Sequence, residues 1–254
     1  MTPNASNDLS KILLAGLPEV QLHQEGFASL VGEDVTDSGT MEWRAWATLH
    51  LDTDEDEENG LGQSHLNDGV SLSDMKSPGE TITVLRADGL VIDLWRVRNI
   101  FDALDARSQD MANFIPMFDT RTRRPAQLAP KLDDMIEPLG NKVLIIDRVT
   151  LAPAWRGLGG VGRLLISRLI PWICGDARLV AVCPYPVELT EDEESDDAVL
   201  AADLKRVRGI WRSLGFRPYT EDIWVMDPAM SDHGRAVKNI ARRLGLDPDA
   251  GWDT

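Results

Sequence analysis

The chain has 254 residues, of which 43% are hydrophobic, enough for one large domain or two small ones with a substantial core. Its net charge of −16 comes mainly from acidic runs at 52–58 and 191–197; without their twelve acids it is about −4, a balance that disfavours nucleic-acid binding. Two cysteines, Cys174 and Cys183, exclude a disulfide framework and give no metal-ligand spacing, and no apolar run is long enough to span a membrane.

The amino terminus lacks the features of an export signal. Its first twenty residues contain one six-residue apolar stretch, no basic start and no clear cleavage site, so we expect a cytoplasmic protein without a signal peptide. Cys183 ends an apolar run, and we interpret it as a small buried hydrophobe rather than a nucleophile.

The first strands are predicted around a long acidic loop. Residues 41–51 alternate apolar and polar side chains, as a half-buried strand does. The acidic and Gly/Ser-containing stretch 52–80 predicts a mobile loop. Residues 81–95 predict two short strands around a turn at Asp88-Gly89.

Two helices are expected next. Apolar residues at helical spacing predict the first over 99–118, through Ile100, Leu104, Met111 and Phe114. A second, short helix is predicted within 125–140, beginning after Pro130.

The second half begins with two buried strands and the helix between them. The runs 142–153 and 177–186 are rich in β-branched residues, which favours buried strands. Helical spacing starts at Val161, and Pro171 should kink or end that helix.

The chain then predicts another helix and a hairpin. The helix covers 198–213 and ends at Gly215, and the hairpin covers 216–227. Strand, helix, strand, helix and hairpin together predict an α/β fold, with a mixed, partly parallel central sheet flanked by helices. An amphipathic basic helix at 231–246, capped at Ser231 or Asp232, is interpreted as a packing helix.

Glycines gather between the strand at 142–153 and the following helix, in "PAWRGLGGVGRLL". Each glycine inside a helix costs roughly 0.5–1 kcal/mol relative to alanine, so the run indicates a use for bare backbone. A helix N-terminus offers unpaired N–H groups and a partial positive charge. The order strand, glycine loop, helix therefore predicts a phosphate cradle.

Two nucleotide-binding motifs fit this loop poorly. A P-loop requires Lys-Ser/Thr after its last glycine, whereas Arg-Leu follows here. Gly157, Gly159 and Gly162 match G-x-G-x-x-G, but four residues separate them from the strand and the next strand does not end in an acid. A nicotinamide oxidoreductase is therefore a distant alternative.

The same stretch resembles the acetyl-CoA-binding motif of the GNAT family of N-acetyltransferases, Arg/Gln-x-x-Gly-x-Gly/Ala after a strand. Arg156 and Gly159 fit its first two positions, whereas the third falls at Val161 and the glycine follows at Gly162. Either the loop carries one extra residue, or the register is shifted and the motif starts at Gly157.

A second stretch, "LKRVRGIWRSLGFRPYTEDIWVMD" at 204–227, is similar to the family's C-terminal helix and hairpin with its Leu-Gly-Phe. The resemblance covers about residues 142–227. It implies an N-terminal segment at 1–40, a GNAT-like acyltransferase domain at 41–228 and a C-terminal helix and tail at 229–254. The acidic loops at 52–60 and 187–198 then lie within the domain.

The resemblance also implies a site for acetyl-CoA. The strand at 142–151 should splay from its neighbour, with the pantetheine arm in the gap against backbone groups of Val149 and Leu151. The pyrophosphate should lie on the glycine loop between two arginines, whose planar forks suit phosphate. The implied cofactor-binding residues are Val149, Leu151, Arg156, Gly157, Gly159, Gly160, Val161, Gly162 and Arg163.

Transfer to an amine requires a proton acceptor. Asp147 lies in the apolar strand, where burial would raise its pKa, and is the candidate base; an ion pair with Arg148 or another basic group is the alternative. Trp211 occupies the slot of the family's tyrosine acid. The thiolate must therefore leave unassisted, take a proton from water, or use Tyr185 or Tyr219.

We expect an acetyl-CoA-dependent N-acetyltransferase that acts on a small-molecule or protein amine, with no nucleic-acid, membrane or metal partner. The alternative is a catalytically inactive GNAT-fold CoA-binding or regulatory module, which Trp211 and the displaced glycine both favour. Trp43, Trp46 and Trp95 could line an acceptor pocket or belong to the core. The oligomeric state is left open, and the surface acidity leans toward a cationic acceptor.

Overall fold

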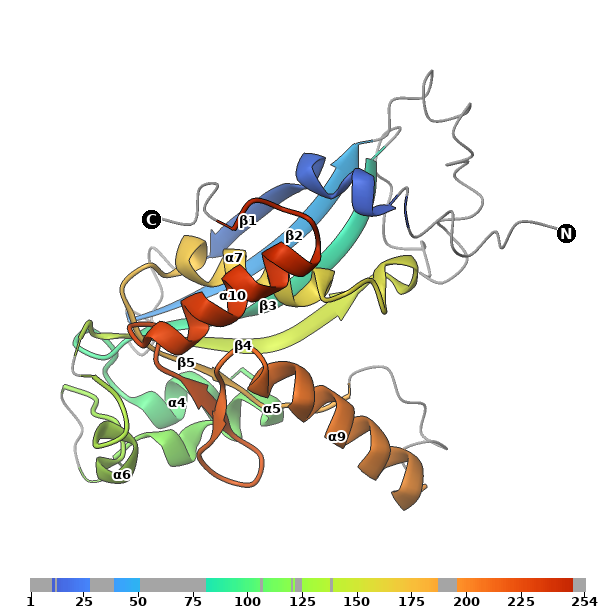
Figure 1. Cartoon of the computed structure of the whole chain (residues 1–254). Coiled ribbons are helices and arrows are strands. Elements are labelled where there is room, and N and C mark those ends of the chain that lie inside the picture. Colours follow the sequence, from blue (N-terminus) through green and yellow to red (C-terminus); the bar gives the residue numbers. More distant parts are fainter. Residues whose placement is uncertain are drawn as a thin grey trace, which may run out of the picture.

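A single mixed sheet runs across the molecule. The computed structural model of the chain describes residues 11, 13–27, 39–50, 81–105, 107–119, 121, 125–137, 139–186 and 196–248. These residues form a seven-stranded sheet in the order β1-β2-β3-β4-β5-β7-β6 (Figure 1). Its strands are β1 (Gln21–Phe27), β2 (Thr40–His50), β3 (Thr81–Asp93), β4 (Lys142–Leu151), β5 (Ala177–Val182), β6 (Arg217–Pro218) and β7 (Trp224–Met226). Neighbouring strands are antiparallel except β4 and β5, so the expected α/β class with a mixed, partly parallel sheet is confirmed.

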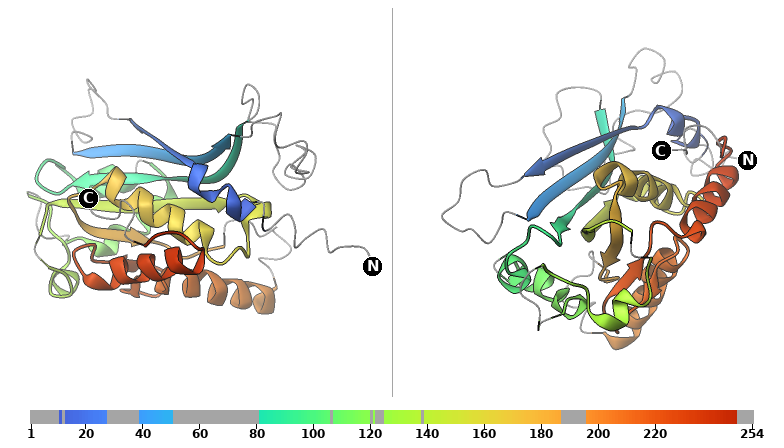
Figure 2. Two further views of the ribbon diagram at one scale, coloured as in Figure 1. Left: turned by 45° about the horizontal axis from the view of Figure 1, so that its top comes forward. Right: turned by 90° about the vertical axis from the view of Figure 1, so that its left-hand side faces the viewer.

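Helices lie on both faces of the sheet (Figures 1 and 2). The helices and 3₁₀ turns are η1 (Leu17–Glu19), α4 (Ile100–Asp105), α5 (Gln109–Ala112), η4 (Ile115–Met117), α6 (Pro130–Asp133), η5 (Pro153–Trp155), α7 (Val161–Ile173), α9 (Asp197–Arg212) and α10 (Ser231–Arg243). One hydrophobic cluster joins the sheet to α7 and α10, and a second joins the opposite face to α4, η4 and α6.

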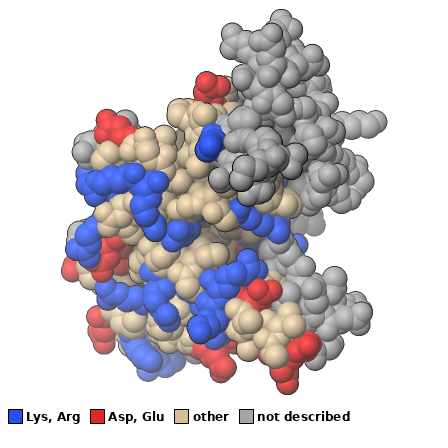
Figure 3. Space-filling model, turned by 45° about the vertical axis from the view of Figure 1, so that its right-hand side comes forward, with Lys and Arg blue, Asp and Glu red and all other residues tan. Residues whose placement is uncertain are grey.

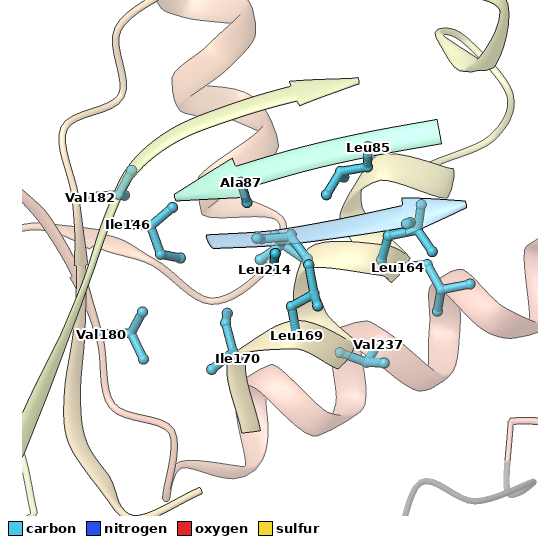
Figure 4. Packing of buried hydrophobic residues seen from close by; sticks show 14 of the residues in the cluster. Leu85, Ala87, Ile146, Leu164, Leu169, Ile170, Val180, Val182, Leu214 and Val237 are labelled. Carbon is cyan, nitrogen blue, oxygen red and sulfur yellow. The ribbon is translucent and has the colours of Figure 1, made fainter. Parts of the chain in front are cut away.

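β4 is buried on both faces, which is why it reads as a continuous apolar run. Leu144 and Ile146 belong to the cluster with α7, and Val143 and Ile145 belong to the other cluster. Successive side chains of a strand point to opposite faces, so the run serves both cores at once. Figure 4 shows Ile146 of the sheet directed toward the side chains that α7 contributes to the first cluster.

The two short strands expected over 81–95 are instead one strand, β3. The register against β4 shifts between Asp88 and Gly89, which marks a bulge rather than a turn. A Cβ on Gly89 would lie 2.0 Å from Ile145 O and 2.9 Å from Trp43 Cζ2. Glycine is present here because another backbone and an indole ring approach closely, a long-range reason that turn signals do not reveal.

The helix expected over 99–118 is broken into α4, α5 and η4. Ser108 Oγ accepts a hydrogen bond from Met111 N at 3.1 Å and starts α5 as its N-cap. Pro116 lies in the first turn of η4. A side-chain cap and a proline thus override an apolar pattern that is continuous at helical spacing.

Three helix ends differ slightly from expectation. α6 begins at Pro130 itself, and α7 continues two residues past Pro171 to Ile173. α10 is preceded by Met230 at its N-cap position, with no side-chain capping bond, so neither Ser231 nor Asp232 caps it. The strand expected at 41–51 and the helix expected at 198–213 agree with β2 and α9 to within one residue at each end.

Residues 21–27 of the amino-terminal segment form the edge strand β1 of the same sheet. The loop expected at 52–80 lies outside the described residues, as does most of 187–198.

Burial raises the pKa of the Cys183 thiol to about 12, in keeping with an inert side chain. No helix in the described ranges combines the length and apolarity needed to cross a bilayer.

Candidate functional site

The site begins where the two parallel strands separate. Pairing between β4 and β5 ends at Ile146 and Val182, although β4 continues to Leu151. The second half of β4 therefore has β3 on one side and an opening on the other.

The backbone of β4 faces that opening at alternate residues. Ala152 N donates to Val84 O of β3 at 2.9 Å. In an antiparallel pair only alternate residues direct their N–H and C=O groups toward the partner strand, so Thr150 shares this direction. Val149 and Leu151 lie between these positions and direct their backbone groups away from β3. Apart from Leu151 O, which accepts a hydrogen bond from Arg156 Nε, they form a row of donors and acceptors that an extended ligand could pair with.

A cavity of about 710 Å³ fills the opening. It is bounded by the end of β4, the glycine loop, the start of α7, the chain after β5 and one face of α9. The structure brings every predicted site residue to its wall: Asp147, Val149, Leu151, Arg156, Gly157, Gly159, Gly160, Val161, Gly162 and Arg163. A volume of this size is typical of small-molecule sites.

The glycine loop adopts a backbone that side chains disfavour. Gly157, Gly159 and Gly160 have φ values of 75°, 69° and 117°. Residues with a Cβ rarely adopt this left-handed region. Gly160 is the N-cap of α7, so the unusual backbone leads directly into the helix.

The amides at the start of α7 are not used within the described structure. Gly159 N donates to Gly157 O, and Leu164 N donates to Gly160 O, both at 3.0 Å. Among the described residues, no hydrogen bond is donated by the intervening backbone N–H groups of Gly160 to Arg163. These donors and the helix dipole make the end of α7 a site suited to an anion.

Two arginines flank this helix end. Arg156 is exposed, and its Nε donates to Leu151 O at 3.0 Å. Arg163 is half-buried, and its Nη1 donates to Ser213 Oγ at 3.0 Å. A Cβ on Gly160 would lie 2.7 Å from Arg163 Nη2, so the guanidinium lies against the loop. Burial and the nearby Arg243 both lower the pKa of Arg163.

Asp147 occupies the point where the strands part. The register pairs Asp88 with Arg148 and Gly89 with Ile146, which leaves Asp147 as the extra residue of β4 at the bulge. Within the described residues its carboxylate makes no hydrogen bond or ion pair, so the alternative of a bridge to Arg148 is not observed. Burial raises the pKa of Asp147, as do the neighbouring carboxylates of Asp88 and Asp110, against a lowering by Arg148.

The aromatic candidates separate into two groups. Trp211 lines the cavity and contacts Phe216 edge to face, with ring centroids 5.0 Å apart. Tyr185 also lines the cavity, whereas Tyr219 OH donates to Pro116 O at 3.3 Å and lies elsewhere. None of Trp43, Trp46 and Trp95 lines this cavity. Trp43 belongs to the core, whereas Trp46 is half-buried and stacks on His23, and Trp95 is 75% exposed and lies outside the core.

Sequence reasoning placed Trp211 at the site but missed the rest of the wall that α9 and the residue after its C-cap provide. Asp203, Val207, Ile210 and Leu214 line the cavity together with Trp211. Their spacing follows one face of a helix, a signal that could have placed them together but not beside β4. The indole of Trp155 is a further addition: Nε1 is buried at the cavity wall without an acceptor among the described residues.

Comparison of the chain with family models, curated proteins and solved structures gave no match. The candidate site is a cavity in an α/β fold. It offers a helix end whose amides have no acceptor in the described structure, a strand edge that no described strand pairs with, and a carboxylate at the fork.

Proposed function

We propose that this chain is an acetyl-CoA-dependent N-acetyltransferase of GNAT-like fold. The observation that carries the proposal is the opening between β4 and β5, which leads to a helix end whose amides have no acceptor in the described structure. Both features belong to one cavity, so a single extended ligand with a phosphate group can contact both.

The residues of this chain suit successive parts of coenzyme A. The amides from Gly160 to Arg163 would accept the diphosphate, with the Arg163 guanidinium beside it. Val149 and Leu151 would pair with the amides of the pantetheine arm, as a neighbouring strand would. The thioester would then lie toward Asp147 at the fork.

Acetyl-CoA supplies an activated acyl group, and the protein must manage the protons. The amine nitrogen bonds to the thioester carbon, the C–S bond breaks, and the amine loses one proton. Asp147 is placed to accept that proton, directly or through water, since it lines the cavity and has no partner among the described residues. Tyr185 lines the same cavity and can donate a proton to the leaving thiolate, a role that Trp211 cannot fill.

The carboxylates at the fork favour a cationic acceptor. Asp147, Asp88 and Asp110 lie close enough for each of the other two to raise the pKa of Asp147. Their combined field attracts an ammonium group and lowers the free energy of its approach. The acceptor amine is therefore proposed to enter in its charged form, to release one proton to water before it attacks, and to give the second proton to Asp147 as the C–N bond forms.

Titration calorimetry with coenzyme A tests the cofactor site. Arg163→Gln removes the guanidinium beside the helix end, and Arg168→Gln, on the same helix but not in the wall of this cavity, is the matched control. We expect the Arg163 variant to bind about tenfold or more weakly than the Arg168 variant, because a hydrogen bond to a charged group contributes about 1.5–3 kcal/mol. Absence of binding to the unmodified protein at millimolar concentration would refute the proposal.

A second candidate is a coenzyme A-binding module without turnover. It is favoured by Trp211, which fills the slot of the family's tyrosine acid and is packed against Phe216. An assay of acetyl transfer to a panel of mono-, di- and polyamines separates the two functions. Binding without acetylation of any amine supports the module, and acetylation of one amine excludes it.

A further inference from the structure

The C-terminal helix α10 ends beside the glycine loop. A Cβ on Gly159 would lie 3.2 Å from Leu244 Cδ2, so the residue that follows α10 contacts the loop. α10 also packs along α7, which brings the last turn of one helix to the first turn of the other (Figure 1). This helix lies outside the stretch 142–227 that resembles an acetyltransferase.

A second cavity, of about 660 Å³, lies on the α10 side of the loop. Arg235, Asn239, Arg242 and Arg243 line it, together with Ser213 at the end of α9. Ser213 also accepts the hydrogen bond of Arg163, which lines the first cavity. The two cavities are therefore neighbours, separated by the Arg163–Ser213 pair.

The wall of this second cavity contains more arginines than carboxylates. Asp232 is the carboxylate in its wall, and it already forms ion pairs with Arg217 and Arg235. Arg242 Nη1 donates to Asn239 Oδ1 at 2.9 Å, a neutral partner. Within the described residues Arg243 has neither a hydrogen bond nor an ion pair, and it lies close enough to Arg163 to lower the pKa of that guanidinium.

Two like charges held close together without an anion repel each other, and a bound anion removes this cost. On the face shown in Figure 3, basic side chains cover more of the described surface than acidic ones do, although the chain as a whole is acidic. Local charge, rather than net charge, decides what the second cavity attracts, and three arginines and one aspartate line that cavity.

The position of the second cavity matches the outer end of coenzyme A. If the pantetheine arm lies inward along β4 and the diphosphate lies at the start of α7, the adenosine end must extend outward past the loop. That end carries a 3′-phosphate with two negative charges. Arginine donors in a planar fork are well suited to such a group.

We propose that α10 carries the subsite for the 3′-phosphate of coenzyme A, with Arg243 as its principal ligand, so that this chain selects coenzyme A over dephospho-coenzyme A. The proposal rests on the acetyltransferase function proposed above and adds a specificity-determining residue to it. The helix is thereby part of the binding site as well as a packing element.

Calorimetric titration with coenzyme A and with dephospho-coenzyme A provides the test. The unmodified protein should bind coenzyme A at least about tenfold more tightly, as expected for a charged hydrogen-bonded pair. Arg243→Gln should reduce this preference to nearly one while leaving the affinity for dephospho-coenzyme A unchanged. Lys238→Gln removes a positive charge from the same helix, but Lys238 does not line this cavity; it is the matched control and should retain the preference.

The outcomes separate this inference from the proposed function. Equal binding of both coenzymes by the unmodified protein overturns the inference alone. Equal weakening of both by Arg243→Gln also overturns it, since the arginine would then act at the diphosphate or on the fold. If neither coenzyme binds, the acetyltransferase proposal and the subsite fail together.

Discussion

Arg163 of α7 donates a hydrogen bond to Ser213 Oγ at 3.0 Å, and this bond joins the first turn of α7 to the end of α9. Ser213 Oγ in turn donates to Ile210 O at 2.6 Å, which orients its lone pairs toward the guanidinium. The arginine is thus held against the glycine loop by a helix fifty residues further along the chain. An ordered guanidinium loses less entropy when it binds an anion.

Removing that hydroxyl should loosen the arginine. We expect Ser213→Ala to lower the free energy of unfolding by about 1 kcal/mol, the usual contribution of a partly buried hydrogen bond. It should also weaken the binding of both coenzyme A and dephospho-coenzyme A, because Arg163 is proposed to contact the diphosphate, which both ligands carry. Denaturant unfolding and calorimetry measure the two effects; a loss confined to coenzyme A would contradict this placement of Arg163.

Asp147 should control the pH dependence of acetyl transfer. A base acts as the carboxylate, so kcat/KM should rise with pH through the raised pKa of Asp147. Asp147→Asn should lower kcat/KM by about 10²–10⁴ and abolish that rise. Because burial disfavours the charged form of Asp147, Asp147→Asn should increase the free energy of unfolding at neutral pH.

Asp88→Asn is the matched control for Asp147. The pKa of Asp88 is also raised, chiefly by burial, but Asp88 does not line the cavity. Asp88→Asn removes part of the field that attracts a cationic acceptor, so KM should increase. The substitution also takes a negative charge away from the neighbourhood of Asp147, so the rise in kcat should move to lower pH with an unchanged plateau. A lowered plateau in this variant would argue against Asp147 as the base.

Gly89 should tolerate no side chain. A Cβ there would lie 2.0 Å from Ile145 O, so we expect Gly89→Ala to destabilise the fold by about 3 kcal/mol or more. A Cβ on Gly234 in α10 would meet nothing within 4 Å, and Gly234→Ala should stabilise the fold by about 0.5–1 kcal/mol. Urea unfolding compares the two, and a neutral Gly89→Ala would be inconsistent with the close approach of β3 and β4.

His233 should make the fold sensitive to acid. Burial lowers its pKa, and its Nδ1 lies 2.9 Å from Leu214 O, an acceptor that a ring N–H can satisfy without a charge. The unfolded chain takes up a proton below about pH 6.5, while the folded chain resists it, so stability should fall as the pH decreases below that value. Between about pH 7.5 and about pH 5, the free energy of unfolding should decrease less in His233→Gln than in the unmodified protein. An equal decrease in both proteins would contradict this role of His233.

Local patterns predict most of the second half of the fold. β4 and β5 are short apolar runs, α9 has a capping aspartate and a terminal glycine, and each of these signals lies within the element that it defines. The glycine loop is predictable as open backbone because glycine has no other local advantage there. The residues that the resemblance implies for a cofactor all line one cavity.

Long-range packing determined two features that the local patterns could not predict, the bulge at Gly89 and the new helix at Ser108. Gly89 resembles a turn residue, but its role depends on Ile145 and Trp43, which are distant in sequence. Apolar spacing over 99–118 could not show that Ser108 would start a new helix.

The sequence by itself predicted the order strand, glycine loop, helix, strand and helix in the second half and the open backbone of the loop, since strand, helix and glycine preferences act within a few residues. Only the tertiary structure decided that β4 parts from β5 at Ile146, that α9 closes the cavity and that Arg243 approaches Arg163. These relationships depend on how separate apolar faces pack around two shared cores, and such packing is a property of the whole chain rather than of any one segment.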